Sequence, residues 1–102
     1  MEQNKILSLL GLAMRSRNLV SGEFQTEAAV KNGSAMLVII AEDASANTKK
    51  MFHDKCTFYG IPLYEYGTKE SIGHAIGQQL RSSIGICDVG LADAIRTKLE
   101  EK

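Results

Sequence analysis

Residues 19–50 read LVSGEFQTEAAVKNGSAMLVIIAEDASANTKK, and this stretch decides the fold. Near its centre, Met36 to Ala41 is a continuous apolar run that contains one valine and two isoleucines. Such a run predicts a strand that is buried on both faces, in a sheet with helices on both sides. The whole stretch predicts a strand–helix–strand–helix unit. We expect this unit to expose the start of one helix and the C-terminal end of the buried strand at one edge.

The helix before the apolar run has recognisable start and stop signals. Leu19-Val20 predicts a short strand, and Ser21 is the expected N-cap of the helix that follows. Residues 28–30, Ala-Ala-Val, give this helix a small apolar face. Asn32-Gly33 is typical of a helix C-terminus, so we expect the helix to end there.

The rest of the chain continues the alternation of helices and strands. Apolar residues at helical spacing predict a first amphipathic helix that ends near residues 15–17. After the acidic turn at 42–45, a further helix is expected to run to about Tyr59, with Phe52, Cys56 and Tyr59 on one face. The remaining expected elements are a strand at 62–66, a helix at 69–76, a strand at 82–88 and a helix at 90–101. This pattern predicts one α/β domain over residues 1–102, a three-layer α/β/α sandwich around a mixed sheet of about four strands.

Composition narrows the class of protein. With 44% hydrophobic and 24% charged residues, the chain resembles an ordinary globular domain. It has no apolar run near the roughly 20 residues that a membrane helix needs, and its N-terminal segment does not resemble a signal peptide. Two cysteines suit a reducing compartment. We therefore expect a cytoplasmic protein without membrane contact.

The charges of the chain balance, with twelve basic and twelve acidic residues. This balance argues against a broadly basic surface that coats nucleic acid. Any binding to nucleic acid must depend on local geometry rather than on a net electrostatic field.

Few residues are suited to metal binding. The chain contains two histidines and two cysteines, at positions 53, 74, 56 and 87. Neither a CxxC nor an HxxxH spacing joins them. Cys56 belongs to an apolar helix stripe and Cys87 lies in an expected strand, so we predict no metal site.

Motifs for nucleotide binding and catalysis are also missing from the sequence. No GxGxxG or GxxxxGK[ST] pattern occurs. Gly67, Gly73 and Gly77 are spaced as a helix cap, a close-packing site and a helix stop. The acidic pair Glu42-Asp43 follows a strand, where carboxylates typically cap a helix or complement its dipole. We predict no catalytic residue, no cofactor and no enzymatic activity.

Three segments, GEFQTEAAVKNG at 22–33, LVIIAEDAS at 37–45 and YGTKESIGHAIG at 66–77, resemble a known family. They are similar to the small bacterial YlxQ/YbxF branch of the kink-turn-binding ribosomal proteins. That family includes archaeal large-subunit protein seven-A-e and eukaryotic large-subunit protein thirty-e. The resemblance covers nearly the whole chain. It implies a monomeric accessory factor, associated with ribosomes or RNA, that binds structured RNA of kink-turn type, ribosomal RNA being one candidate. RNA of this kind is read by shape and by unstacked bases.

The resemblance also implies which residues contact the RNA. In the family, RNA is held by the start of the helix after the first strand and by the turn after the second strand. A loop before the last strand packs apolar groups on an extruded base. Carried onto this chain, these positions are Gly22, Glu23, Phe24, Gln25, Ala28, Lys31, Asn32, Ser45, Lys69, Leu80 and Arg81.

The chain departs from the family pattern at the helix start. Ala28 replaces a lysine, which removes a contact worth about 1–3 kcal/mol if that lysine met a base edge. Phe24 stands where many relatives have a polar side chain, and it either stacks on a base or packs under the first helix. The alternative function is therefore a protein–protein adaptor on the same scaffold that has lost its affinity for RNA.

Overall fold

Helices and strands alternate along the chain in the computed structural model, which describes residues 2–101. The elements are α1 (Glu2–Arg15), β1 (Leu19–Ser21), α2 (Glu23–Asn32), β2 (Leu37–Ile40), α3 (Ala46–Tyr59), β3 (Leu63–Glu65), α4 (Lys69–Ala75), β4 (Ser83–Ile86) and α5 (Val89–Glu100). The order expected from the sequence is confirmed. None of the helices within residues 2–101 has the length and apolar content that crossing a membrane requires.

The four strands form one mixed sheet in the order β1-β4-β2-β3. β2 runs parallel to β3, whereas β4 runs antiparallel to both β1 and β2. β1, β2 and β3 therefore point in the same direction, and β4 alone points the other way. As a result, the carboxyl ends of three strands and the start of the fourth lie at the same edge of the sheet.

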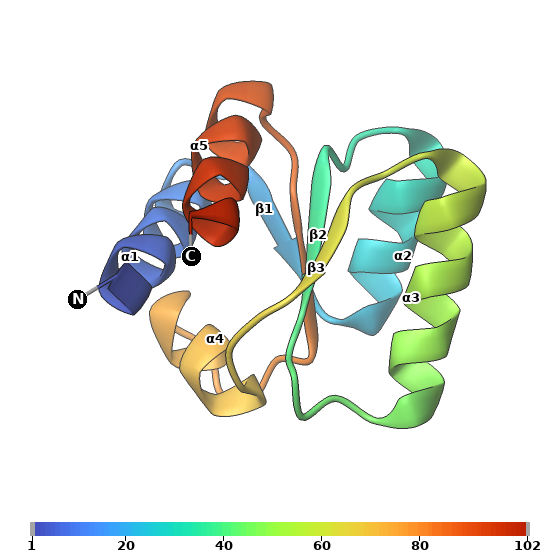
Figure 1. Ribbon diagram of the computed structural model, residues 1–102, viewed down its shortest axis with the longest axis horizontal. Coiled ribbons are helices and arrows are strands. Elements are labelled where there is room, and N and C mark those ends of the chain that lie inside the picture. The colour runs from blue at the N-terminus through green and yellow to red at the C-terminus, as the bar shows by residue number, and fades with distance from the viewer. Residues whose placement is uncertain (1, 102) are drawn as a thin grey trace.

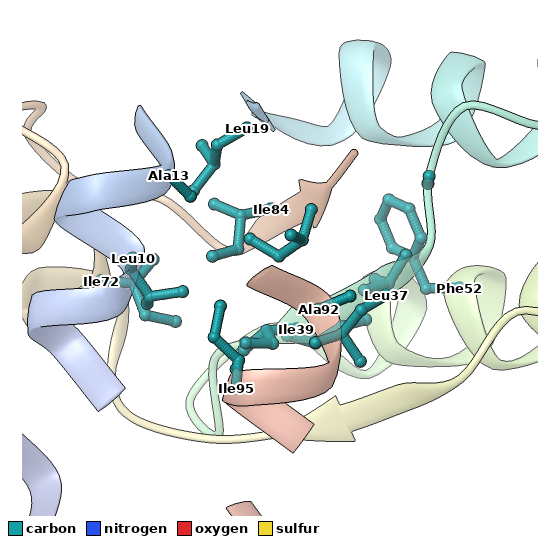
Figure 2. Packing of buried hydrophobic residues seen from close by; sticks show 14 of the residues in the cluster. Leu10, Ala13, Leu19, Leu37, Ile39, Phe52, Ile72, Ile84, Ala92 and Ile95 are labelled. Carbon is teal, nitrogen blue, oxygen red and sulfur yellow. The ribbon is translucent and has the colours of Figure 1, made fainter. Parts of the chain in front are cut away.

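Helices cover both faces of this sheet. Figure 1 shows α2 and α3 on one face and α1, α4 and α5 on the other, which confirms the predicted three-layer sandwich. All four residues of β2 are buried, as its continuous apolar sequence predicted. Successive strand residues point to opposite faces, and Figure 2 shows Leu37 and Ile39 near Ala92 and Ile95 of α5.

Some local expectations were wrong. Ser21 is the last residue of β1 and does not cap α2. The N-cap is Gly22, which makes no side-chain capping bond. The Ser21 hydroxyl instead accepts a hydrogen bond from Arg81 Nε at 3.3 Å, because β1 lies beside the segment that leads into β4.

The apolar faces of two helices are also smaller than predicted. Ala28 is exposed, while Ala29 and Val30 carry the packing of α2. Tyr59 is 41% exposed because α3 ends there and the chain turns away at Gly60. Cys87 lies one residue beyond β4 rather than inside a strand.

Candidate nucleic-acid interface

Four segments meet at the edge where β1, β2 and β3 end. Backbone hydrogen bonds join them: Gly22 donates to the Ser83 carbonyl at 3.0 Å, Ala41 to that of Ser82 at 2.9 Å, and Glu42 to that of Gly67 at 2.8 Å. We refer to residues 22–25, 42–45, 67–69 and 78–82 as the strand-end surface. It brings together most of the residues that the sequence predicted for RNA contact, from positions up to 60 residues apart in the chain.

Gly22 begins this surface in a conformation that glycine favours. Its φ of 93° lies in a region that side chains rarely adopt. A Cβ built on Gly22 would meet no atom within 4 Å, so the space beside this backbone is open. A ligand can therefore approach the chain closely where α2 begins.

The side chains that follow Gly22 point into solvent. Phe24 is 84% exposed, and Gln25 and Ala28 are also exposed. The alternative in which Phe24 packs under the first helix is thereby excluded. Thr26, which is fully buried, anchors this turn of the helix instead. The first turn of α2 thus presents an unpaired aromatic ring beside a polar amide.

The turn after β2 is tied to the start of α4. Asp43 Oδ1 accepts a hydrogen bond from the backbone N–H of Lys69 at 2.8 Å. Ser45 is the N-cap of α3, where its hydroxyl accepts from the Thr48 N–H at 3.1 Å. Of the acidic pair, Asp43 has a helix-capping role, and it serves the helix that begins 26 residues later rather than the one that follows it directly. Sequence reasoning did not include Asp43 in the site, although its place directly after the buried strand was a signal.

The loop at 78–82 is fastened to the rest of this surface through Arg81. The guanidinium donates to Ser21 Oγ at 3.3 Å, to the Leu80 carbonyl at 2.9 Å and to Gln78 Oε1 at 3.1 Å. The Arg81 N–H also donates to the Lys69 carbonyl at 3.1 Å. These bonds hold the loop in place while Leu80 stays 59% exposed.

Lys31 and Asn32 lie away from the strand-end surface. They are at the far end of α2, about 12 Å along the helix axis from its first residue. Lys31 Nζ lies 3.5 Å from Glu27 Oε2. The side-chain oxygen of Asn32 accepts from the Ser34 N–H at 2.9 Å, within the turn that ends the helix. The structure therefore does not bring these two residues together with the others.

The strand-end surface is not basic. It contains the three carboxylates of Glu23, Glu42 and Asp43 and the two cations of Lys69 and Arg81, a balance of two minus three, or −1. Burial, followed by the negative charge of Glu42, raises the pKa of the neighbouring Tyr66 hydroxyl. Within residues 2–101, no group of three or more His, Cys, Asp or Glu side chains is placed to hold a metal ion.

Comparisons with known proteins agree on one family. The model of the ribosomal protein L7Ae/L30e/S12e/Gadd45 family matches residues 4–95. The RNA-binding protein YlxQ of Bacillus subtilis is 38% identical over 92 residues, which cover 90% of this chain and 92% of that protein. The RNA-binding protein YlxQ of Enterococcus faecium is 39% identical over 98 residues, which cover 96% of this chain and 94% of that protein. A Bacillus halodurans protein of unknown function has a solved structure that matches with a TM-score of 0.92 and 44% identity, over 95% of this chain and 98% of that one.

Proposed function

This chain belongs to the ribosomal protein L7Ae/L30e/S12e/Gadd45 family, and we propose that it binds structured RNA of kink-turn type at the strand-end surface. It acts as a non-catalytic, monomeric accessory factor in the cytoplasm, associated with ribosomal or other structured RNA. The observation that carries this proposal is the exposure of Phe24 and Leu80, which are 84% and 59% exposed on a surface without excess positive charge.

Each part of the surface has a role in reading a bent RNA. The open backbone at Gly22 allows a base edge to come close to the start of α2. Gln25 supplies both a donor and an acceptor for that edge. The Phe24 ring stacks on an unpaired base, and Leu80 packs on a second, extruded base. Because bases leave the stack only where the duplex is bent or interrupted, this set selects shape.

A binding assay with matched RNAs tests the proposal. We expect a kink-turn RNA to bind more tightly than a straight duplex of the same length and base composition. Phe24→Ala should weaken kink-turn binding by about 1–3 kcal/mol, the typical contribution of one base–aromatic stack. Phe58→Ala is the matched control, because Phe58 is 79% exposed at the opposite end of the molecule, at the close of α3.

Two results would contradict the proposal. One is equal affinity for the kinked and straight RNAs, and the other is an equal effect of Phe24→Ala and Phe58→Ala. Purified protein without material absorbing at 260 nm, and without affinity for the kinked RNA, would favour the adaptor alternative. The observation behind that alternative is Ala28, where an exposed methyl group replaces the lysine that is usual in the family.

A further inference from the structure

A hollow between α1 and α4 extends beyond the strand-end surface. It has a volume of about 440 Å³, and its walls include Ser8, Arg15 and His74. We call this hollow the α1–α4 cleft. Its described lining residues include a guanidinium, an imidazole and hydroxyl groups, and none of them is a carboxylate. Hydrogen-bond donors, one of them a guanidinium, without a neighbouring carboxylate are the typical lining of an anion-binding site.

The cleft is continuous with the proposed RNA surface. A second hollow, of about 290 Å³, is lined by Glu42, Gly67 and Thr68 of that surface, so a carboxylate faces it, in contrast to the described lining of the α1–α4 cleft. The two hollows share Leu7 and Ser71 as walls. From Leu7 to Arg15 the cleft follows α1 for about 12 Å. An RNA strand that continues from the strand-end surface along α1 therefore reaches Arg15.

The guanidinium of Arg15 lies where α1 crosses α4. A Cβ at Gly11 would be 3.0 Å from the Ala75 carbonyl oxygen and 3.2 Å from Arg15 Nη1. Glycine at this position allows the two helices to approach closely, with the guanidinium beside the contact. The Ser71 hydroxyl is occupied in the capping bonds of α4, whereas Ser8 and His74 are exposed. Arg15 is thus the charged group that a ligand in this cleft would meet.

The distribution of ion pairs also indicates that Arg15 is available to an anionic ligand. Six cations of the described part of the chain lie within 4.0 Å of a carboxylate: Lys31, Lys49, Lys50, Lys55, Arg96 and Lys98. The described lysines and arginines that form no ion pair with a described residue are Lys5, Arg15, Arg17, Lys69 and Arg81. Three of these lie on α1 or directly after it, and two lie on the strand-end surface. Cations without a described ion pair are therefore found on α1 and directly after it, whereas on the strand-end surface Lys69 and Arg81 are outnumbered by three carboxylates.

We infer that the α1–α4 cleft binds a backbone phosphate of an RNA arm that continues past the strand-end surface, with the Arg15 guanidinium as the principal ligand. This inference rests on the proposed function, because the RNA must first be seated at the strand-end surface. A guanidinium forms paired hydrogen bonds to phosphate oxygens and keeps its charge at all relevant pH values. Ser8 and His74 add donors on the opposite sides of the cleft.

The experiment uses two kink-turn RNAs that differ only in arm length. In the short RNA, the arm ends close to the bend, and in the long RNA it continues for several more base pairs. We expect wild-type protein to bind the long RNA more tightly. Arg15→Gln should weaken binding of the long RNA about threefold to tenfold and reduce the slope of log K against log salt by about one, while leaving the short RNA unaffected.

Lys50→Gln is the charge-matched control, since Lys50 is 78% exposed on α3, on the other face of the sheet. Circular dichroism and thermal unfolding establish that both variants are folded. The inference would be overturned if Arg15→Gln and Lys50→Gln lowered RNA affinity equally. It would also be overturned if Arg15→Gln lowered the affinity for the short and the long RNA by the same factor. Preference of the wild-type protein for kinked over straight RNA would in that case still support the proposed function. If the wild-type protein showed no preference for kinked over straight RNA, the proposed function itself would be overturned.

Discussion

At the scale of single residues, neighbouring positions of α2 serve different purposes: some pack on the sheet, and others are available for binding. Thr26, Ala29 and Val30 are buried and attach the helix to the sheet. Phe24 and Gln25 directly precede Thr26 in the sequence but point into solvent. An exposed side chain buries little apolar surface, so its replacement changes stability by only a few tenths of a kcal/mol, about 0.5 at most. Substitutions on the exposed face therefore report on recognition rather than on folding.

The first prediction uses Gln25 and Ala28, which share the exposed face of α2 because they are three residues apart. Ala28→Lys should tighten kink-turn binding by about 1 kcal/mol or more, since it adds a cation and a donor near the bend. Gln25→Ala should weaken binding by a similar amount, with unfolding temperatures unchanged. Isothermal titration of each variant against the same RNA measures both effects. If neither substitution alters affinity, the start of α2 is not an RNA surface.

The second prediction concerns the thiol of Cys56, which is only 2% exposed. Burial raises the pKa of this thiol to about 11, whereas an unfolded cysteine titrates near 8.5. A pKa raised by folding means that the stability from the neutral buried thiol is intact below about pH 8.5 and is lost as pH rises towards 11. Wild-type protein should therefore lose on the order of 3 kcal/mol over this range relative to Cys56→Ala, since one pKa unit corresponds to about 1.4 kcal/mol.

Denaturant unfolding of both proteins from pH 8 to 11 measures this difference. Parallel stability curves would contradict the prediction, because alanine cannot titrate. At pH 8, Cys56 should also react slowly with thiol reagents until the protein unfolds, since the thiolate is the reactive form.

At the scale of elements, the shortest helix organises the site. α4 spans Lys69–Ala75, and its start is held by Asp43 from the turn after β2. Its other face is in direct contact with the backbone of the loop at 78–82, because Gly73 has no side chain. A Cβ on Gly73 would lie 1.4 Å from the Gln79 carbonyl oxygen. The loop that carries Leu80 is therefore positioned by α4 as much as by its own hydrogen bonds.

The third prediction follows from that contact. Gly73→Ala should force the loop away from α4, destabilising the fold by about 1–3 kcal/mol through overpacking. The displaced Leu80 and Arg81 should also lower RNA affinity, beyond what the loss of stability explains at temperatures where the variant is folded. Gly33→Ala is a useful control, since a Cβ there meets no atom within 4 Å although its φ of 84° makes the substitution strained. An affinity loss equal in both variants would show that loop position is not the cause.

At the scale of the whole molecule, charge is balanced overall but not uniformly placed. Ion pairs join α2 to α3 through Glu27 and Lys55, and α3 to β3 through Lys49 and Glu65. These pairs neutralise much of the side that faces away from α1. Exposed pairs of this kind contribute little to stability. The described cations outside such pairs lie on α1, directly after it, or on the strand-end surface, where three carboxylates accompany Lys69 and Arg81.

The fourth prediction concerns the salt dependence of binding for the entire protein. With a formal net charge of zero, few phosphates can be neutralised, so we expect a slope equivalent to about two to four ion pairs. Fluorescence anisotropy over a series of salt concentrations measures it. A slope of about eight or more, together with equal affinity for straight duplex, would indicate generic electrostatic binding.

The sequence by itself determined the order of elements and the α/β class, because both depend on local patterns. The apolar run around Val38, the stop at Gly33 and the turn signals around Pro62 act on neighbouring residues, so their structural effects are readable without the rest of the chain. The three-layer arrangement followed from the same signals, since a strand buried on both faces requires helices on both sides.

The tertiary structure alone decided how the site is assembled. β4 lies between β1 and β2, and this order brings the loop at 78–82 beside Gly22, 60 residues earlier. The bond from Lys69 to Asp43 depends on the parallel pairing of β2 with β3, which places the segments after both strands at the same edge. The exposure of Phe24 depends on which face of α2 packs on the sheet. The distance of Lys31 from the strand-end surface likewise depends on which end of α2 meets that edge. Long-range hydrogen bonds and burial depend on the path of the whole chain, and no local pattern in the sequence encodes that path.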